Sequence, residues 1–183
     1  MKRDIFLDTE TTGLGPQAGR KDQIIEIAFV WHDEDGIHSI QEFCNPGPEY
    51  LQDCDEALNI QGRTILDVLK FQDIYKAARK VKNSIMEIPG EKIYHSWNIP
   101  FDKYFVEQDP WNLNLNWGDD PMVLASRYMG YSYDRIALWK AVNFFEIEMP
   151  EKFHFHSALA DAYMAMKVYE AIGKKRWKNE HNE

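Results

Sequence analysis

Cysteine and long apolar runs are both scarce in this chain of 183 residues. Its two cysteines, Cys44 and Cys54, cannot form a disulfide framework, and no Cys/His spacing typical of a zinc site accompanies them. The apolar run near the amino terminus is broken by charge at Asp8 and Glu10, so it is too short for a signal peptide or a membrane span. We therefore expect a cytoplasmic protein with no membrane segment.

Positive charge is also in deficit, because the formal net charge is −9. A protein that grips a long stretch of nucleic acid usually carries an excess of Lys and Arg. The charge balance therefore argues against tight binding over a long footprint. It does not argue against catalysis at the end of a strand, where few contacts are needed and bound cations offset part of the acidity.

The chain lacks internal repeats, low-complexity tracts and Ser/Gly linkers, so nothing divides it into separate domains. Apolar residues make up 44% of the composition, which is enough to bury a core. We expect a single domain over residues 1–173. The remaining residues, 174–183, begin with a cluster of lysine and arginine and predict a flexible basic tail.

The spacing of apolar residues divides the chain into strands and helices. Strands are expected over 4–8, 24–31, 37–44 and 93–97. Helices are expected over 55–84 with an interruption near Gly62, from 101, over 122–129, over 134–146 and over 157–172. Gly36 separates the second and third strands, which predicts a hairpin. Three strands followed by alternating strand and helices predict an α/β fold, with a mixed central sheet whose first three strands are antiparallel.

Two carboxylates, Asp8 and Glu10, stand two residues apart where the first predicted strand ends. In an extended chain, residues at this spacing share one face, so both can reach the same cation. Oxygen ligands suit a hard ion such as Mg²⁺ or Mn²⁺ rather than zinc. Taken alone, a strand that simply ends in polar residues is the simpler explanation.

A third carboxylate, Asp102, closes the segment Asn98-Ile-Pro-Phe-Asp that follows a predicted strand. It stands just inside the next predicted helix, a position that can direct a side chain into a cleft. In isolation, stabilisation of the helix amino terminus explains an acidic residue here equally well.

A fourth carboxylate, Asp161, lies on the last predicted helix, five residues after His156. Inside one helix, side chains at this spacing point about 140° apart. The two can converge only if His156 lies on the loop before the helix. On its own, His156 is explained as a surface histidine, since the chain has six.

Together, these three elements resemble the motifs of the DEDD superfamily of 3′→5′ exonucleases, which carries four acids in three motifs. Residues 6–14 resemble the first motif, 98–102 the second and 156–161 the third. A histidine five residues before the last acid is typical of the DEDDh, or DnaQ-like, branch. The other branch has Tyr where this chain has Ser157. The resemblance covers roughly residues 4–172, and it departs from the family only where two residues separate His95 from the Asn of the second motif.

The resemblance implies an RNase H-like fold and hydrolysis of single-stranded DNA or RNA 3′ ends to nucleoside 5′-monophosphates. It assigns two Mg²⁺ or Mn²⁺ ions to four ligands, which are Asp8, Glu10, Asp102 and Asp161. Two such ions can activate a water and neutralise the leaving oxygen. His156 is implied as the general base.

The same resemblance implies contacts with the substrate. Thr11 is placed to form a hydrogen bond near the 3′ hydroxyl, and Leu14 to contact the terminal base. Asn98 and Phe101 are expected to line the same cleft. Ordinary packing in a core or a turn is an equal explanation for each of the last two.

Two other functions share part of the pattern. A phosphatase of the haloacid-dehalogenase type also begins with a strand that ends in paired acids, but it needs Asp where Glu10 stands. It also needs a late acid after Gly-Asp, and none follows Asp119 at positions 123 or 124. A catalytically silent nuclease-like domain that binds nucleic acid or a partner is the second alternative, although the four acids and the histidine are all present. The choice between DNA and RNA stays open, as does a homodimer or a polymerase or repair partner.

Overall fold

A computed structural model describes residues 2–15, 21–151 and 153–181 of the chain. At its centre is a five-stranded sheet with the order β4-β3-β2-β1-β5. The strands are β1 (Lys2–Thr11), β2 (Ile24–Asp33), β3 (Gly36–Asn45), β4 (Gln72–Asp73) and β5 (Glu91–His95). β1, β2 and β3 pair antiparallel in succession, whereas β5 pairs parallel with β1 and β4 parallel with β3. The prediction of a mixed sheet with three antiparallel strands first is confirmed.

Helices form in each range that the sequence predicts, with different bounds, and a short 3₁₀ helix forms at 48–50, where none was predicted. They are η1 (Pro48–Tyr50, a 3₁₀ helix), α1 (Asp55–Ile60), α2 (Ile65–Val68), α3 (Ile74–Glu87), α4 (Ile99–Val106), α5 (Pro121–Tyr128), α6 (Leu138–Phe144) and α7 (Ala158–His181). The range 55–84 is not one helix with a single interruption, because it is divided among α1, α2, the short strand β4 and α3. Gly62 follows α1 with a φ of 67°, and Thr64 begins α2 through a capping box with Asp67.

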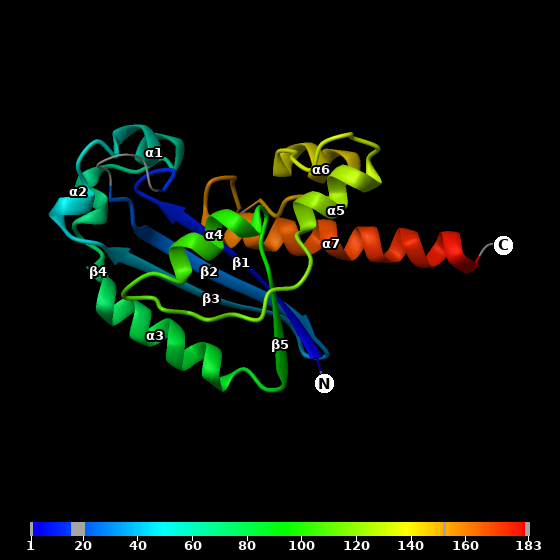
Figure 1. The fold of residues 1–183 in the computed structure, drawn as a ribbon, viewed down its shortest axis with the longest axis horizontal. Coiled ribbons are helices and arrows are strands. Elements are labelled where there is room, and N and C mark those ends of the chain that lie inside the picture. Colours follow the sequence, from blue (N-terminus) through cyan, green and yellow to red (C-terminus); the bar gives the residue numbers. More distant parts are fainter. Residues whose placement is uncertain (1, 16–20, 152, 182–183) are drawn as a thin grey trace.

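β1 is buried on both faces, because successive residues of a strand point to opposite sides. Ile5 and Leu7 pack into the core beneath α3. Phe6 points the other way and packs against α7. The sheet therefore lies between α3 and α7 (Figure 1). Asp8 and Glu10 continue the row of Phe6, so the two acids stand on the face that α7 covers.

The last helix, α7, is longer than its apolar pattern predicts. The pattern ends near residue 172, whereas the helix continues to His181. In Figure 1 its final turns project beyond the sheet. The backbone of the basic segment from Lys174 to His181 is thus part of a helix, and residues 182–183 of the predicted tail lie outside the described residues. The flexibility of this segment stays a prediction. Within the described ranges, no helix is both long and apolar enough to span a bilayer.

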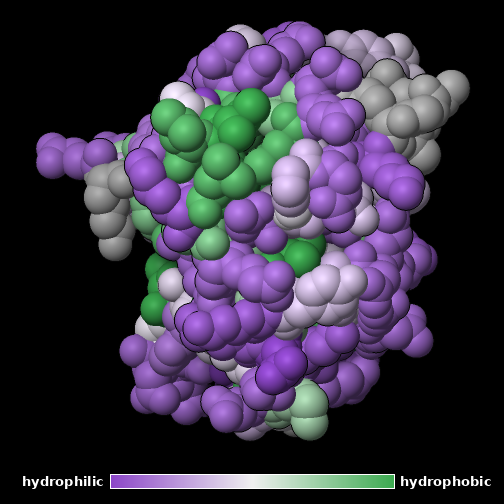
Figure 2. All heavy atoms as spheres, turned by 90° about the vertical axis from the view of Figure 1, so that its left-hand side faces the viewer, coloured by the Kyte–Doolittle hydropathy of each residue, from purple (hydrophilic) through white to green (hydrophobic). Residues whose placement is uncertain are grey.

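α1 and α2 form a small separate layer at the edge of the sheet. Leu58 and Val68 turn inward and pack with Ile25 of β2. Other apolar side chains of this segment face outward, and Leu66 is 69% exposed. Figure 2 shows the resulting apolar patch on an otherwise polar face.

Candidate active site

Asp8 and Glu10 lie at the carboxyl-terminal end of β1. In the antiparallel register Asp8 faces Ala28 and Glu10 faces Glu26 of β2. The register shifts directly after Glu10, between that residue and Thr11. Such an irregularity ends regular pairing and turns the following backbone away from the sheet, so the chain leaves β1 beside the two acids.

Asp102 reaches this end of β1 from α4, which begins just after β5. Asn98 makes the sharp entry with a φ of 81°, and the carboxylate of Asp120 accepts a hydrogen bond from the amide of Ile99 at 2.9 Å. Asp102 is buried, and its Oδ1 accepts a hydrogen bond from the Thr9 hydroxyl at 2.7 Å. The position just inside the helix is the one predicted from the sequence.

Asp161 and His156 meet as the five-residue spacing requires. α7 begins at Ala158, so His156 lies on the loop before the helix. Its φ of 66° is in the left-handed region, which non-glycine residues rarely adopt. The backbone N–H of His156 donates to Asp161 Oδ2 at 3.2 Å. The histidine and the acid therefore converge, and the condition for their pairing is met.

The four carboxylates influence one another strongly. Burial raises the pKa of Asp8 well above its usual value, and the charges of Asp102 and Asp161 raise it further. Burial followed by the charge of Asp161 raises the pKa of Glu10 to about 8. Burial also raises the pKa of Asp102 to about 7, against the opposing hydrogen bond from Thr9. These groups behave as one crowded cluster of negative charge.

Burial likewise raises the pKa of Asp161 to about 7, although its hydrogen bond from the His156 backbone opposes the rise. The Oδ1 atom of Asp161 is buried and has no hydrogen-bond partner. One ligand atom each from Glu10, His156 and Asp161 lie within 4.8 Å of one another. The cluster offers several oxygen ligands that repel one another, and one carboxylate oxygen of Asp161 has no hydrogen-bond partner. This chemistry fits a divalent cation such as Mg²⁺ or Mn²⁺.

The loop after β1 is held firmly, yet it presents an exposed apolar side chain. The Thr11 hydroxyl donates to the carbonyl of Gly13 at 2.6 Å, and Gln61 donates to the Thr11 carbonyl at 2.9 Å. A Cβ on Gly13 would lie 2.5 Å from the carboxylate of Asp22, so a larger residue here would displace that side chain. Leu14, the next residue, is 79% exposed.

Two adjoining hollows meet at Leu14 and Phe101. The first measures about 330 Å³ and is bordered by Glu10, Thr11 and the exposed Ile60 of α1. The second measures about 300 Å³, shares Leu14 and Phe101 with the first, and is lined by Asn98, Pro100, Tyr104 and Arg135. The four residues expected to contact substrate thus line these two adjoining hollows, with Thr11 in the first, Asn98 in the second, and Leu14 and Phe101 in both; the two together are called the cleft below.

The sequence reasoning missed two charged residues next to the acids. Glu26 of β2 is fully buried and forms an ion pair with Arg63, which lies between α1 and α2. Its charge helps to raise the pKa of Glu10, whereas that of Arg63 lowers it. The available signal was a lone acid inside the apolar run 24–30.

The histidine at the end of β5 is used elsewhere. His95 is buried and stacks on Phe6, with ring centroids 4.9 Å apart. Its Nδ1 lies 2.8 Å from the carbonyl oxygen of Asp119, and its Nε2 lies 3.1 Å from Asp4 Oδ1. Both ring nitrogens are engaged, so His95 is a structural residue and His156 is the histidine of the acidic cluster.

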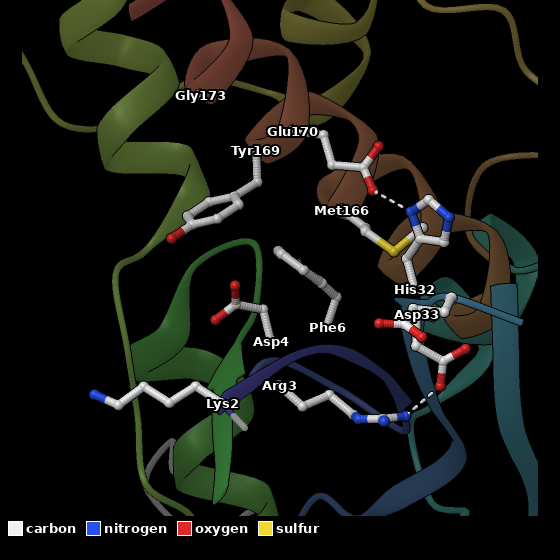
Figure 3. A pocket seen from close by; sticks show the side chains of 11 residues that line it. Lys2, Arg3, Asp4, Phe6, His32, Asp33, Met166, Tyr169, Glu170 and Gly173 are labelled. Atoms are coloured by element: carbon white, nitrogen blue, oxygen red, sulfur yellow. Dashed lines mark hydrogen bonds and ion pairs between the residues drawn. The ribbon is translucent and has the colours of Figure 1, made fainter. Parts of the chain in front are cut away.

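A further hollow of about 350 Å³ lies at the opposite end of β1. Figure 3 shows its apolar floor, with Phe6, Met166 and Tyr169 surrounded by charged side chains. Here His32 lies 3.1 Å from Glu170, and the ion pair of Arg3 with Asp33 lies beside them. The predicted acids do not line this cavity.

The chain is similar to known exonucleases in sequence. The model of the RNase T family, described as exonuclease, matches residues 5–169. DNA polymerase III subunit epsilon of Rickettsia typhi is 29% identical over 179 residues, which are 93% of this chain and 73% of that protein.

Solved nucleases share the fold. Exonuclease X in complex with 5′ overhanging duplex DNA has a TM-score of 0.67 at 23% identity, covering 96% of this chain and 92% of its own. The nuclease domain of 3′hExo, a DEDDh family member bound to rAMP, has a TM-score of 0.73 at 14% identity, covering 94% and 92%. The mixed sheet and its flanking helices are therefore RNase H-like, as predicted.

Proposed function

Because this chain belongs to the RNase T family of exonucleases, we propose that it is a 3′→5′ exonuclease that uses two Mg²⁺ or Mn²⁺ ions. Its substrate is the 3′ end of single-stranded DNA or RNA, and its products are nucleoside 5′-monophosphates. The observation that carries this proposal is the convergence of four acids with His156, which come from three separate parts of the chain.

The acids Asp8, Glu10, Asp102 and Asp161 are the residues that would hold the ions. Divalent ions bound there supply the positive charge that activates water and stabilises the leaving oxygen. The acids repel one another when they are ionised, and either protonation or a bound cation relieves that repulsion. Bound cations would allow all four acids to stay ionised. The unpartnered Asp161 Oδ1 supports this role, since a buried carboxylate oxygen usually has a donor or a metal.

His156 is suited to accept the proton of the attacking water. Its side chain is exposed at the edge of the acidic cluster, within 4.8 Å of the ligand atoms of Glu10 and Asp161. A neutral imidazole is a common general base in enzymes. The anchored backbone N–H of His156 keeps the ring beside the reacting atoms.

The cleft is suited to hold the terminal nucleotides. Leu14 and Phe101 offer apolar surface for a base, and Thr11 lies beside them at the border with the acids. Arg135 and Tyr104 line the second hollow, where a phosphate and the next base could be held. A grip on few nucleotides is also consistent with the net charge of −9. 3′hExo was solved with rAMP, a single nucleotide.

The relatives suggest a setting for this activity. The Rickettsia protein is a polymerase subunit, so a DNA polymerase or a repair complex is a fitting partner, in the cytoplasm. Exonuclease X was solved with DNA, so DNA is the first substrate to test. A homodimer is a further arrangement that size measurements can address.

The test compares 5′-labelled single-stranded DNA, single-stranded RNA and duplex DNA, with Mn²⁺ or with EDTA. We expect a ladder that shortens from the 3′ end, slows when the 3′ hydroxyl is blocked and stops in EDTA. Equal cutting of circular single-stranded DNA would reveal an endonuclease instead. Binding of strands without any hydrolysis, in every metal, would favour the catalytically silent alternative.

A further inference from the structure

The loop that carries His156 is tied to the sheet by a hydrogen bond outside the acidic cluster. The hydroxyl of Ser157 donates to Glu26 Oε1 at 3.2 Å. Glu26 belongs to β2, which is 131 residues away from Ser157 in the sequence. Other hydrogen bonds of this segment are local. They run from the His156 amide to Asp161, from the Asp161 amide to the Ser157 carbonyl and from the Phe153 amide to the Pro150 carbonyl.

Glu26 is held rigidly by three partners. Gln41 of β3 donates to the same Oε1 atom at 2.7 Å, and Arg63 donates to Oε2. Arg63 is itself fixed, because its guanidinium lies over the ring of Phe43, 5.0 Å from the ring centroid. Both carboxylate oxygens of Glu26 are therefore engaged, so this acid is unsuited to be a metal ligand. It is suited to be a fixed anchor.

The backbone of His156 needs such an anchor. A left-handed conformation is strained for a residue with a side chain, and it persists only where neighbouring contacts hold it. Ser157 is the next residue, so fixing its side chain limits how the backbone at 156 can relax. That backbone sets the direction in which the His156 side chain leaves the chain.

We propose that Glu26, locked by Arg63 and Gln41, is a positioning residue that holds His156 over the acidic cluster through the hydroxyl of Ser157. This inference rests on the proposed function, in which His156 is the general base. It adds that the base is placed by a buried ion pair that belongs neither to the metal ligands nor to the helix that carries Asp161. General bases lose efficiency when their geometry is relaxed, because proton transfer depends on distance and orientation.

Ser157 is the sharpest place to test the connection. Removing Glu26 or Arg63 leaves the other charge buried and unpaired, so those variants could fail by misfolding. Ser157→Ala removes only the tether and keeps the ion pair, and Ser157→Thr retains the hydroxyl as a matched control. We expect Ser157→Ala to lower kcat by about tenfold, the size of a lost hydrogen bond to a charged group, with KM unchanged. Ser157→Thr should recover most of kcat.

A measurement on the metal-free protein gives a second readout. The His156 amide should exchange with solvent faster in Ser157→Ala, because its bond to Asp161 depends on the same loop geometry. Exchange in the middle of α7 should stay as in the wild type, and the affinity for Mn²⁺ should not change. Faster exchange throughout α7, or weaker Mn²⁺ binding, would overturn the inference in favour of a general structural role.

A double-mutant cycle with His156→Ala decides how the tether acts. If Ser157 works through His156, Ser157→Ala should have no further effect on kcat once His156 is absent. An equal loss in both backgrounds would overturn the inference. If His156→Ala is impaired while Ser157→Ala is fully active, this inference fails and the proposed function stands. If both variants are fully active, the base assignment fails and the inference fails with it.

Discussion

Acidic side chains gather at both ends of β1. At one end they are paired with basic side chains, and at the other, among the described residues, they are not. At the amino-terminal end, Asp33 lies 2.5 Å from Arg3 and 2.8 Å from His38, and Glu170 lies 3.0 Å from Lys167. At the carboxyl-terminal end, within the described residues, the four clustered acids form no ion pair with Lys or Arg. Arg63, whose charge lowers the pKa of Glu10, is already paired with Glu26.

The pKa values follow the same division. At the amino-terminal end, desolvation by itself raises the pKa of Asp33, but hydrogen bonds from His38 and Arg3 outweigh it and leave the pKa below its usual value. At the other end, burial and mutual repulsion raise the pKa of Asp8 and its neighbours. The two ends of the β1–β2 strand pair thus show the difference between acids that stabilise a fold and acids arranged for a ligand. Buried acids without cations of their own indicate that cations come from outside.

The largest effect should come from Asp8→Ala. Loss of a metal-holding carboxylate should abolish turnover, a fall of about 10⁴-fold or more, because bound ions contribute several kcal/mol to the transition state. Initial rates on a 5′-labelled strand with Mn²⁺ would measure it. Asp33→Ala, at the paired end of the same strand pair, is the matched control and should keep kcat. Equal losses in the two variants would mean that the two ends do not differ in function.

His156→Ala should be next in size. A positioned general base contributes about 10² to 10⁴ in rate, so kcat should fall by that factor. Binding of Mn²⁺, followed by calorimetry, should persist because the four carboxylates remain. His154→Ala is the control, since His154 is exposed and lies two residues earlier. Loss of activity in the His154 variant alone would show that the motif has been placed on the wrong histidine.

Arg135→Ala should produce a smaller change that concerns binding. Arg135 lines the cleft and makes no ion pair within the described part of the chain, whereas Arg127 pairs with Asp134 at 3.0 Å. We expect KM for single strands to rise about three- to tenfold in Arg135→Ala, with a shallower dependence on salt. Arg127→Ala should leave KM unchanged. A similar salt dependence in wild type and Arg135→Ala would remove this residue from the substrate path.

The two ends should also respond oppositely to pH in the metal-free protein. The pKa of Glu10 is raised to about 8 and that of Asp161 to about 7 in the folded state, so the folded state binds more protons than the unfolded state between pH 4 and 8. Stability should therefore fall as pH rises through this window. The melting temperature in EDTA should drop by about 5 °C between pH 5 and pH 8. Saturating Mn²⁺ should abolish the drop.

Asp8→Asn and Asp33→Asn separate the contributions of the two ends. Asp8→Asn removes one charge from the crowded cluster, so it should flatten the decline in EDTA. The lowered pKa of Asp33 stabilises the fold above the usual pKa of an Asp and is lost only as pH falls below about 4. Asp33→Asn should therefore leave the decline between pH 5 and pH 8 unchanged. A decline that persists in Asp8→Asn would show that the cluster is not its source.

Much of the fold could be predicted from the spacing of apolar residues. The element bounds that were predicted wrongly have local physical causes. Each of the predicted strands is present, because apolar runs bounded by Gly or Pro are strong local signals. The range 55–84 is divided because Thr64 and Asp73 cap new helices, and capping depends on side-chain bonds that apolar periodicity does not record. α7 runs past residue 172 because a helix can continue on backbone bonds after its apolar face ends.

Of the candidate site, the motif residues were recognisable and their supporting contacts were not. The acids and His156 occupy fixed distances along the chain, so their pattern is visible without a structure. Glu26 shows only as a lone acid in an apolar strand. The proposed role of Glu26 depends on the strand register, which sets it opposite Glu10. It also depends on bonds to Arg63 and Ser157, which come from distant parts of the sequence.

The sequence by itself determined which residues could carry the chemistry, because strand alternation and helix starts are local geometry that fixes where each side chain begins. Asp8 and Glu10 must share a face, and Asp102 must open a helix. Only the tertiary structure decided that these acids meet without cations of their own and that His156 adopts a left-handed backbone tied to β2. Those outcomes depend on strand register and on contacts between segments far apart in the sequence, and neither can be deduced from the order of neighbouring residues.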